Sequence, residues 1–141
     1  MVSPNVLRAE DGTEVHSLTV PRTGESASVC RGVVRRALRD WHFTNLTEDA
    51  ETVVTELVAN SVRHARHGSV RLIVRRTESG VRIAVTDRSH AVPVLRCPEP
   101  GGETGRGLAI INALAVRWGH ESLPWGKSVW ADMEHLGRCS P

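Results

Sequence analysis

Alternation of apolar and polar residues predicts most of the strands in this chain. The segments "EVHSLTVP" (residues 14–21), "SVRLIVRR" (69–76) and "VRIAVTD" (81–87) each alternate and end at turn-forming residues. The short turn "TESG" between the last two indicates a hairpin. The segment "WGHESLPWGKSVWADME" (118–134) predicts a second hairpin, which turns at "LPWG".

Apolar residues at a spacing of three and four predict three helices, over residues 26–41, about 46–65 and 108–118. Asn45 stands before the second helix and Glu48 three residues later, which is the pattern of a capping box. The third helix opens directly from glycines.

This order of elements favours an α+β fold. Strands joined by tight turns are antiparallel, and helices in separate blocks suggest one layer of helices over one sheet. We expect a two-layer sandwich of a mixed, mostly antiparallel sheet covered by about three helices on one face. A single domain is expected over residues 14–136, between a flexible N-terminus (1–13) and a short tail (137–141).

Composition narrows the class of protein. With 141 residues, 40% hydrophobic and 24% charged, the chain can bury a core of its own. A net charge of +2 gives no argument for nucleic acid, and three scattered cysteines indicate neither a disulfide framework nor a zinc knuckle. No leader peptide or membrane span is expected, so we predict a cytoplasmic protein. All but one of the 18 basic residues are arginines, and Lys127 is expected at the surface.

Candidate chemistry begins on the second helix, where Glu56, Asn60 and His64 follow one another at four-residue spacing. Successive members lie about 40° apart around the helix, at the border of its apolar face. Asparagine is a poor residue for the middle of a helix, but its carbonyl oxygen suits Mg²⁺. A nearby glutamate can accept a hydroxyl proton. The alternative is a half-exposed polar edge with a salt bridge from Glu56 to Arg63.

Two further features strengthen a functional interpretation. Asp87 ends a strand immediately before a long loop, where its carboxylate can accept a hydrogen bond from a base amine, although aspartate is also a common turn former. Gly105 and Gly107 stand at the start of a helix, where backbone N–H groups attract anions. Flexible loop glycines are the alternative.

Taken together, these segments resemble the histidine-kinase/Hsp90-like (GHKL) ATP-binding fold, and most closely the anti-sigma-factor serine kinases. The resemblance covers about residues 14–134. "ELVANSVRHA" is similar to the family's N-box, "VTD" to the start of its adenine box, "GRGLAIINALA" to its lid-to-helix element and "GKSVWADM" to its closing strand.

The resemblance implies a role for each of these residues. Asn60 would hold Mg²⁺ against the ATP phosphates, Asp87 would accept the adenine amino group, and Ser128 would help at the adenine. Glu56 would be the base for an acceptor serine. The residues expected to cradle the phosphates are Gly105, Arg106, Gly107 and Leu108.

The adenine box departs from the family's D-x-G-x-G pattern. It is written "DRSHA" here, with Ser89 and Ala91 in place of glycines. Side chains at these positions would crowd the base, so weaker ATP binding is expected.

The resemblance therefore implies an ATP- and Mg²⁺-dependent regulator that phosphorylates a serine of an antagonist protein and also binds a sigma factor. No direct binding of nucleic acid or membrane is expected, and a homodimer is left open. The alternative is an inactive nucleotide-sensing or protein-binding module with a degenerate adenine site.

Overall fold

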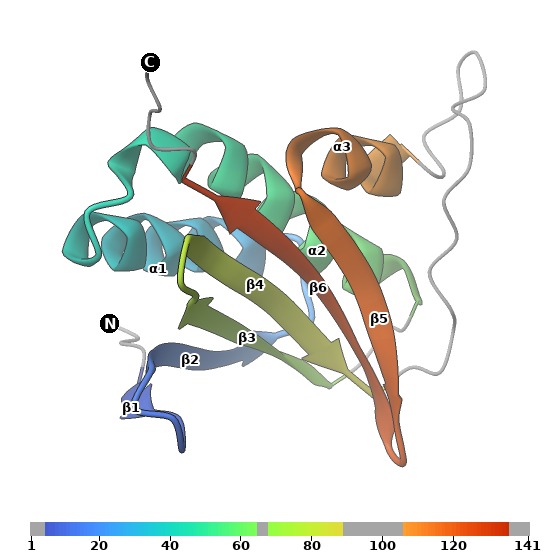
Figure 1. Cartoon of the computed structure of the whole chain (residues 1–141). Helices are drawn as coiled ribbons and strands as arrows, with labels where there is room; N and C mark the ends of the chain where they lie inside the picture. The colour runs from blue at the N-terminus through green and yellow to red at the C-terminus, as the bar shows by residue number, and fades with distance from the viewer. Residues whose placement is uncertain (1–4, 65–67, 89–105, 136–141) are drawn as a thin grey trace.

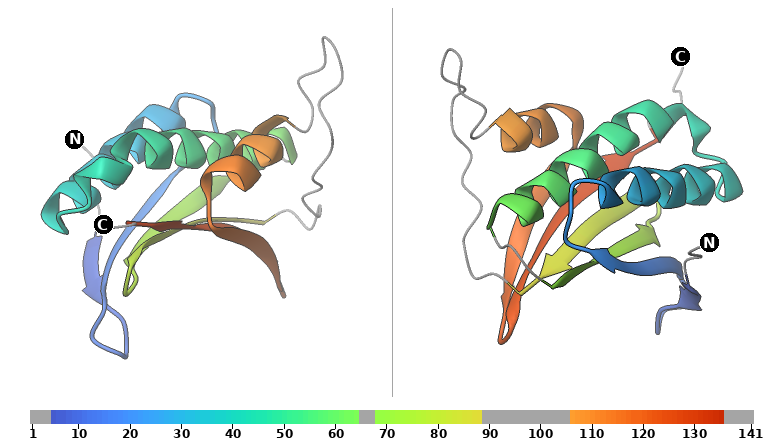
Figure 2. Two further views of the ribbon diagram at one scale, coloured as in Figure 1. Left: turned by 45° about the horizontal axis from the view of Figure 1, so that its top comes forward. Right: turned by 180° about the vertical axis from the view of Figure 1, so that it is seen from behind.

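The strands form one layer of a two-layer fold and the helices form the other. The computed structural model describes residues 5–64, 68–88 and 106–135. Its strands make a six-stranded sheet in the order β1-β2-β3-β4-β6-β5, and its helices cover one face of that sheet (Figures 1 and 2). The strands are β1 (Asn5–Arg8), β2 (Glu14–Pro21), β3 (Ser69–Arg76), β4 (Gly80–Asp87), β5 (Arg117–Leu123) and β6 (Gly126–Glu134). The helices are α1 (Ser26–Asp40), the 3₁₀ turn η1 (Thr44–Leu46), α2 (Thr47–His64) and α3 (Arg106–Leu114).

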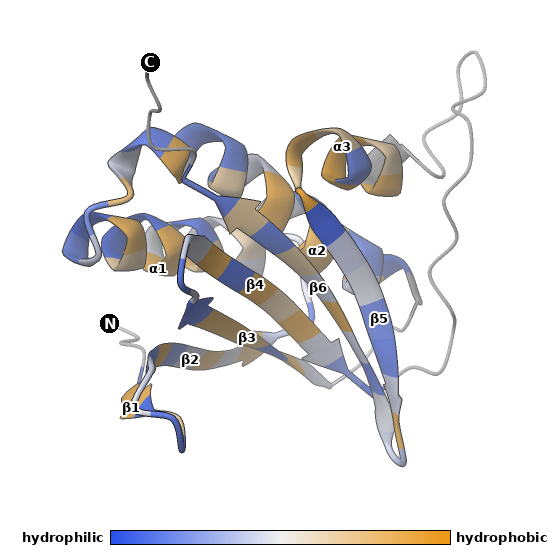
Figure 3. Ribbon diagram, in the orientation of Figure 1, coloured by the Kyte–Doolittle hydropathy of each residue, from blue (hydrophilic) through white to orange (hydrophobic). Residues whose placement is uncertain are grey.

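The predicted α+β sandwich is confirmed. Every neighbouring pair of described strands runs antiparallel. Side chains alternate across the sheet, so that Leu72, Val85 and Val129 lie side by side on three strands and face the helices. The alternation is visible as bands of colour along β3, β4 and β6 (Figure 3). The core therefore lies between the sheet and the helices.

Helix α2 is the central helix of its layer, because it contacts α1, α3 and the strands β4 and β6. Its apolar stripe is the one that the sequence predicts. Val53, Val54, Leu57 and Val58 are all at most 1% exposed. Such a fully buried stripe fixes the rotation of the helix, and with it the direction in which Asn60 points.

The N-terminal segment differs from the prediction. The sequence predicts a flexible segment over residues 1–13, but Asn5–Arg8 form strand β1, which pairs with β2. All four of these residues are exposed. Backbone pairing with β2, rather than burial of side chains, therefore holds this short edge strand on the sheet.

Two helix ends also differ from the prediction. Asn45 lies inside η1, and its Oδ1 is 2.6 Å from Nδ1 of His135, so no capping box forms. Helix α3 ends at Leu114, and Trp118 belongs to β5, where its Nε1 donates to Oδ1 of Asn112. At the start of α2 and at the end of α3, a tertiary contact therefore overrides the helical pattern of the local sequence.

Candidate functional site

Asp87, the predicted base-binding carboxylate, forms a buried ion pair with Lys127. Asp87 is the last residue of β4, and Lys127 lies directly opposite it on β6. The lysine Nζ is 3.2 Å from each carboxylate oxygen. The two side chains are only 1% and 2% exposed. The expectation that Lys127 lies at the surface is therefore wrong.

The alternation of β6 explains why this lysine is buried. Lys127 shares a face of the strand with Val129, Ala131 and Met133, which belong to the core on the helix side. The sequence carries this signal, because the three apolar residues follow the lysine at every second position. Its partner lies 40 residues away, however, and only the pairing of β4 with β6 brings the two together.

Gly126 allows strands β4 and β6 to approach each other closely beside the ion pair. A Cβ atom on Gly126 would overlap the carbonyl oxygen of Asp87 and lie 2.7 Å from Cα of Arg88. Real side chains do not tolerate such contacts with backbone. The glycine before Lys127 therefore fixes the position of the ion pair.

Asn60 provides a second buried polar group on the helix side of the sheet. It is 4% exposed, and its Nδ2 has no hydrogen-bond partner among the described residues. The Oγ atom of the neighbouring Ser61 is in the same situation. An unsatisfied buried donor costs roughly 1–3 kcal/mol, and most buried polar groups avoid it. The side-chain donor of Asn60, near the C-terminal end of α2, is therefore suited to meet a ligand.

Glu56, one turn before Asn60, is partly exposed. It lines an open groove of about 630 Å³ between α1, η1 and α2, together with Arg31 and Thr55. Nη1 of Arg31 donates to Oγ1 of Thr55 at 3.1 Å. In the part of the chain that the structure describes, Glu56 forms no ion pair, so the alternative salt bridge to Arg63 is not found. The carboxylate of Glu56 therefore remains available to a molecule in this groove.

The elements that carry these residues lie toward one side of the molecule. The C-terminal end of α2, the C-terminal end of β4 and the first turn of α3 all lie toward the same side in Figures 1 and 2. The arrangement combines a carboxylate with an ammonium, a buried amide and a helix N-terminus. Such a set can bind a ligand with a polar ring at one end and an anionic group at the other.

Comparison with known proteins identifies the family. The family model of the histidine kinase-like ATPase domain matches residues 20–131. The chain belongs to this family. An uncharacterised protein of Streptomyces coelicolor is 43% identical over 75 residues, which are 48% of this chain and 69% of that protein. The ATPase domain thus has the GHKL-type fold that its motifs resemble, and ATP is the ligand that this family implies.

Ser128 is not brought together with the other site residues of the ATPase domain. It pairs with Thr86, and it lines a pocket with Ala84 and Trp130 on the sheet face away from the helices. Asp87 and Lys127 occupy the helix side of the same two strands. The geometry therefore does not favour contact between Ser128 and a base held by Asp87.

The predicted phosphate-binding segment of the ATPase domain is described only in part. Gly105, like Ser89 and Ala91 of the adenine box, lies outside the described residues. Helix α3 begins at Arg106 and includes Gly107. Leu108 is 3% exposed and belongs to the core, so only its backbone is suited to contact a phosphate.

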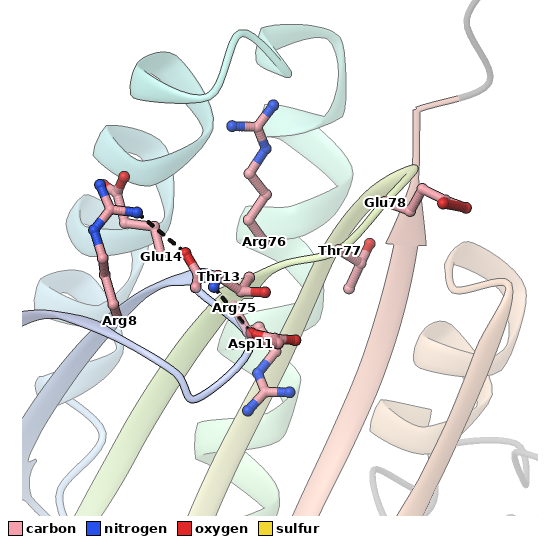
Figure 4. Close-up of a pocket in the computed structure, with 9 residues that line it drawn as sticks. Arg8, Asp11, Thr13, Glu14, Arg75, Arg76, Thr77 and Glu78 are labelled. Atoms are coloured by element: carbon pink, nitrogen blue, oxygen red, sulfur yellow. Dashed lines mark hydrogen bonds between the residues drawn. The ribbon is translucent and has the colours of Figure 1, made fainter.

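A separate cavity of about 600 Å³ lies at the other end of the sheet (Figure 4). It is lined by the β1–β2 and β3–β4 turns, which place Arg8, Asp11, Glu14 and Glu78 around it. The β3–β4 turn precedes β4, and Asp87 ends that strand. This mixed-charge cavity therefore does not belong to the candidate nucleotide site.

The described helices of the ATPase domain include none that is both long and apolar enough to cross a bilayer.

Proposed function

We propose that this ATPase domain binds ATP with Mg²⁺ and transfers the terminal phosphoryl group to a serine of a partner protein, as the anti-sigma-factor serine kinases do. The observation that carries the proposal is Asn60, a buried residue whose Nδ2 has no hydrogen-bond partner among the described residues and which stands at the position that resembles the family's N-box asparagine. Most buried side-chain donors have a partner, so an unsatisfied one at this position favours a binding role over a packing role.

The residues of the site have separate roles in this proposal. The carbonyl oxygen of Asn60 is a hard, neutral oxygen that holds Mg²⁺, while its Nδ2 donates to a phosphate oxygen. Asp87 accepts a hydrogen bond from the amino group of the base. Bound Mg-ATP would supply the phosphoryl group and the neutralisation of its charge. Glu56 accepts the proton of the acceptor serine hydroxyl.

The groove beside Glu56 supports a protein substrate. It is open, it lies between two helices, and Glu56 is one of the residues that line it. An extended segment that enters this groove would bring a serine hydroxyl to Glu56. We propose an antagonist protein as the phosphorylated partner and a sigma factor as a second partner. Light scattering in solution distinguishes a monomer from a homodimer.

Calorimetric titration with ATP and Mg²⁺ tests the nucleotide site. The wild-type chain should bind ATP, and Asn60→Ala should weaken binding more strongly when Mg²⁺ is present than when it is absent. Asp87→Leu combined with Lys127→Met replaces the buried ion pair by apolar residues and should abolish binding while the fold is kept. Asn45→Ala is the matched control, since this amide contacts His135, which follows Glu134, and Glu134 pairs with the start of β4, whereas Asp87 ends that strand. Equal ATP affinity for Asn60→Ala and the wild type would contradict the assignment of Asn60.

Glu56→Gln tests the proposed transfer step. The amide keeps the size of the side chain but cannot accept the proton. Phosphorylation of the cognate partner should fall by roughly 10²–10⁴, with ATP affinity unchanged. An unchanged rate would remove Glu56 from the chemistry.

The second candidate function is a protein-binding module without phosphoryl transfer. It is favoured by one observation, the closed ion pair between Asp87 and Lys127 at the place where the base would bind. Absence of binding heat at millimolar ATP would support this candidate over the first.

A further inference from the structure

We propose that Lys127 and Asp87 together recognise the nucleotide base through hydrogen bonds. In this proposal Asp87 accepts a hydrogen bond from the exocyclic amino group of adenine, and the ammonium of Lys127 donates to the ring nitrogen beside it. The inference rests on the proposed function, because it takes the site at Asp87 to be the base site. It adds a specificity-determining residue that the motif resemblance does not name.

The position of Lys127 on β6 is the first argument. The resemblance assigns a hydroxyl residue near Gly126 to the base, and Ser128 has the right chemistry. Ser128, however, lies on the sheet face away from the helices. On the helix side, the first β6 residue after Gly126 is Lys127, and it lies directly opposite Asp87. A base bound at Asp87 would therefore meet an ammonium instead of a hydroxyl.

The hydrogen-bonding capacity of the pair is the second argument. A carboxylate can accept roughly four hydrogen bonds and an ammonium can donate three. The ion pair alone does not exhaust either group. Adenine presents an amino donor with a ring-nitrogen acceptor on each side, N1 on one edge and N7 on the other. Such a donor–acceptor edge is complementary to a carboxylate beside an ammonium.

Burial argues against displacement of Lys127 by the base. If the base replaced the lysine at Asp87, the ammonium would be left unpaired in a site where the side chain is 2% exposed. Removing one partner of a buried ion pair is strongly unfavourable. A base that bonds to both groups leaves the ion pair intact. Joint recognition is therefore the mode that this geometry favours.

The test compares ATP with 1-deaza-ATP and 7-deaza-ATP, in which one ring nitrogen is replaced by a carbon, in calorimetric titrations of the full chain. A hydrogen bond from a charged donor is worth about 10- to 100-fold in affinity. The wild type should lose about that much affinity for one of the two analogues. If both analogues bind as tightly as ATP, the inference is overturned without any variant.

Lys127→Met supplies the second arm of the test, because methionine has a similar length and no donor. Removal of the ammonium beside Asp87 should lower the stability, so circular dichroism first verifies the fold of this variant. The folded variant should bind ATP and the discriminated analogue with nearly equal affinity. Arg39→Met is the matched control: Arg39 is an exposed cation in the last turn of α1, and its removal should leave the discrimination unchanged. Discrimination that persists in Lys127→Met would assign the lost bond to another group and overturn the inference.

The outcomes also separate this inference from the proposed function. If ATP binds and neither analogue is discriminated, only the role of Lys127 fails. If the wild type binds no nucleotide, the proposed function and the role of Lys127 both fail. If discrimination depends on Lys127 but no partner is phosphorylated, the base-reading role stands and the kinase assignment fails.

Discussion

At the scale of single residues, the buried carboxylates on the two faces of the sheet have different charged partners. Asp87 is paired with one ammonium in the interior, whereas Asp132 on the other face meets two partly exposed arginines. Nε of Arg82 lies 2.7 Å from one oxygen of Asp132, and Nε of Arg117 lies 3.2 Å from the other. Arg82 also stacks over the ring of Trp130, 4.0 Å from its centroid. Two arginines therefore share one carboxylate on the open face.

These contacts predict a stability that depends on pH. Burial raises the pKa of Asp132, but the hydrogen bonds and charges of Arg82 and Arg117 outweigh it, so the pKa is below the usual 3.8. A lowered folded-state pKa stabilises the protein above about pH 4, and this contribution is lost as the pH falls through the folded-state value. Asp132→Asn should lower the free energy of unfolding by about 1–2 kcal/mol at pH 7 and by less at pH 3, measured by urea titration.

The control for this experiment is Asp40→Asn. Asp40 is exposed and forms no ion pair in the described part of the chain. Its substitution should change the unfolding free energy similarly at both pH values. If Asp132→Asn behaved in the same way as Asp40→Asn, the arginine contacts would have no part in acid stability.

The candidate site shows which residue-level properties can be predicted from sequence. The border position of Asn60 follows from helical periodicity, because a local pattern determines it. The burial of Lys127 could have been predicted from its alternation with Val129 and Ala131, but a lone lysine before a hydrophobic strand is more often exposed. The side of the sheet on which Ser128 lies follows from the same alternation.

At the scale of elements, glycines at two positions have opposite significance. Gly126 at the start of β6 leaves no room for a Cβ, since Asp87 and Arg88 backbone atoms occupy that space. Gly32 in the middle of α1 has nothing within 4 Å of such an atom. The first glycine permits the close approach of two strands, whereas the second only weakens a helix.

This contrast predicts opposite effects of the same substitution. Gly126→Ala should destabilise the protein by about 2 kcal/mol or more and weaken ATP binding, because β4 and β6 must separate at the ion pair. Gly32→Ala should stabilise it by roughly 0.5–1 kcal/mol and leave ATP binding unchanged. Thermal unfolding followed by circular dichroism measures the stability of both variants, and calorimetric titration measures their ATP affinity. A neutral Gly126→Ala would mean that the strands are not held as closely as the structure has them.

The elements that the sequence predicted well are those with long, regular patterns. Strands β2 to β4 and helix α2 alternate or repeat over eight residues or more. Strand β1 was not predicted, because four exposed residues carry no periodic signal and depend on β2 for pairing. The predicted end of α3 is too late, because Ala115, Val116 and Trp118 continue the apolar pattern, although Ala115 and Val116 connect the helix to β5 and Trp118 belongs to that strand.

At the scale of the whole molecule, the candidate site joins the helical layer to the sheet. Asn60 comes from α2, whereas Asp87 and Lys127 come from adjacent strands. Helix α2 also holds α1 and α3 in place. A ligand bound by all three residues would therefore stabilise the fold as a unit.

ATP should accordingly raise the midpoint of thermal unfolding. At a concentration one hundred times its dissociation constant, a ligand that binds only the folded state adds about 2.7 kcal/mol. For a domain of this size the midpoint should rise by about 5–10 °C. Differential scanning fluorimetry with ATP and Mg²⁺ measures the shift, and Asn60→Ala should reduce it. A shift that Asn60→Ala leaves unchanged would place the nucleotide elsewhere on the molecule.

The buried position of Lys127 also makes it a natural chemical probe. It is the single lysine of the sequence, and every other basic side chain is a guanidinium or an imidazole, which amine-acylating reagents modify poorly. Acylation of a lysine side chain can therefore occur only when the Asp87–Lys127 pair opens to solvent. The labelling rate, followed by mass spectrometry of the peptide that contains Lys127, should be far below that of a free lysine and should fall further with ATP. The opening of this site can thus be timed in the wild-type sequence, without introducing a reactive residue.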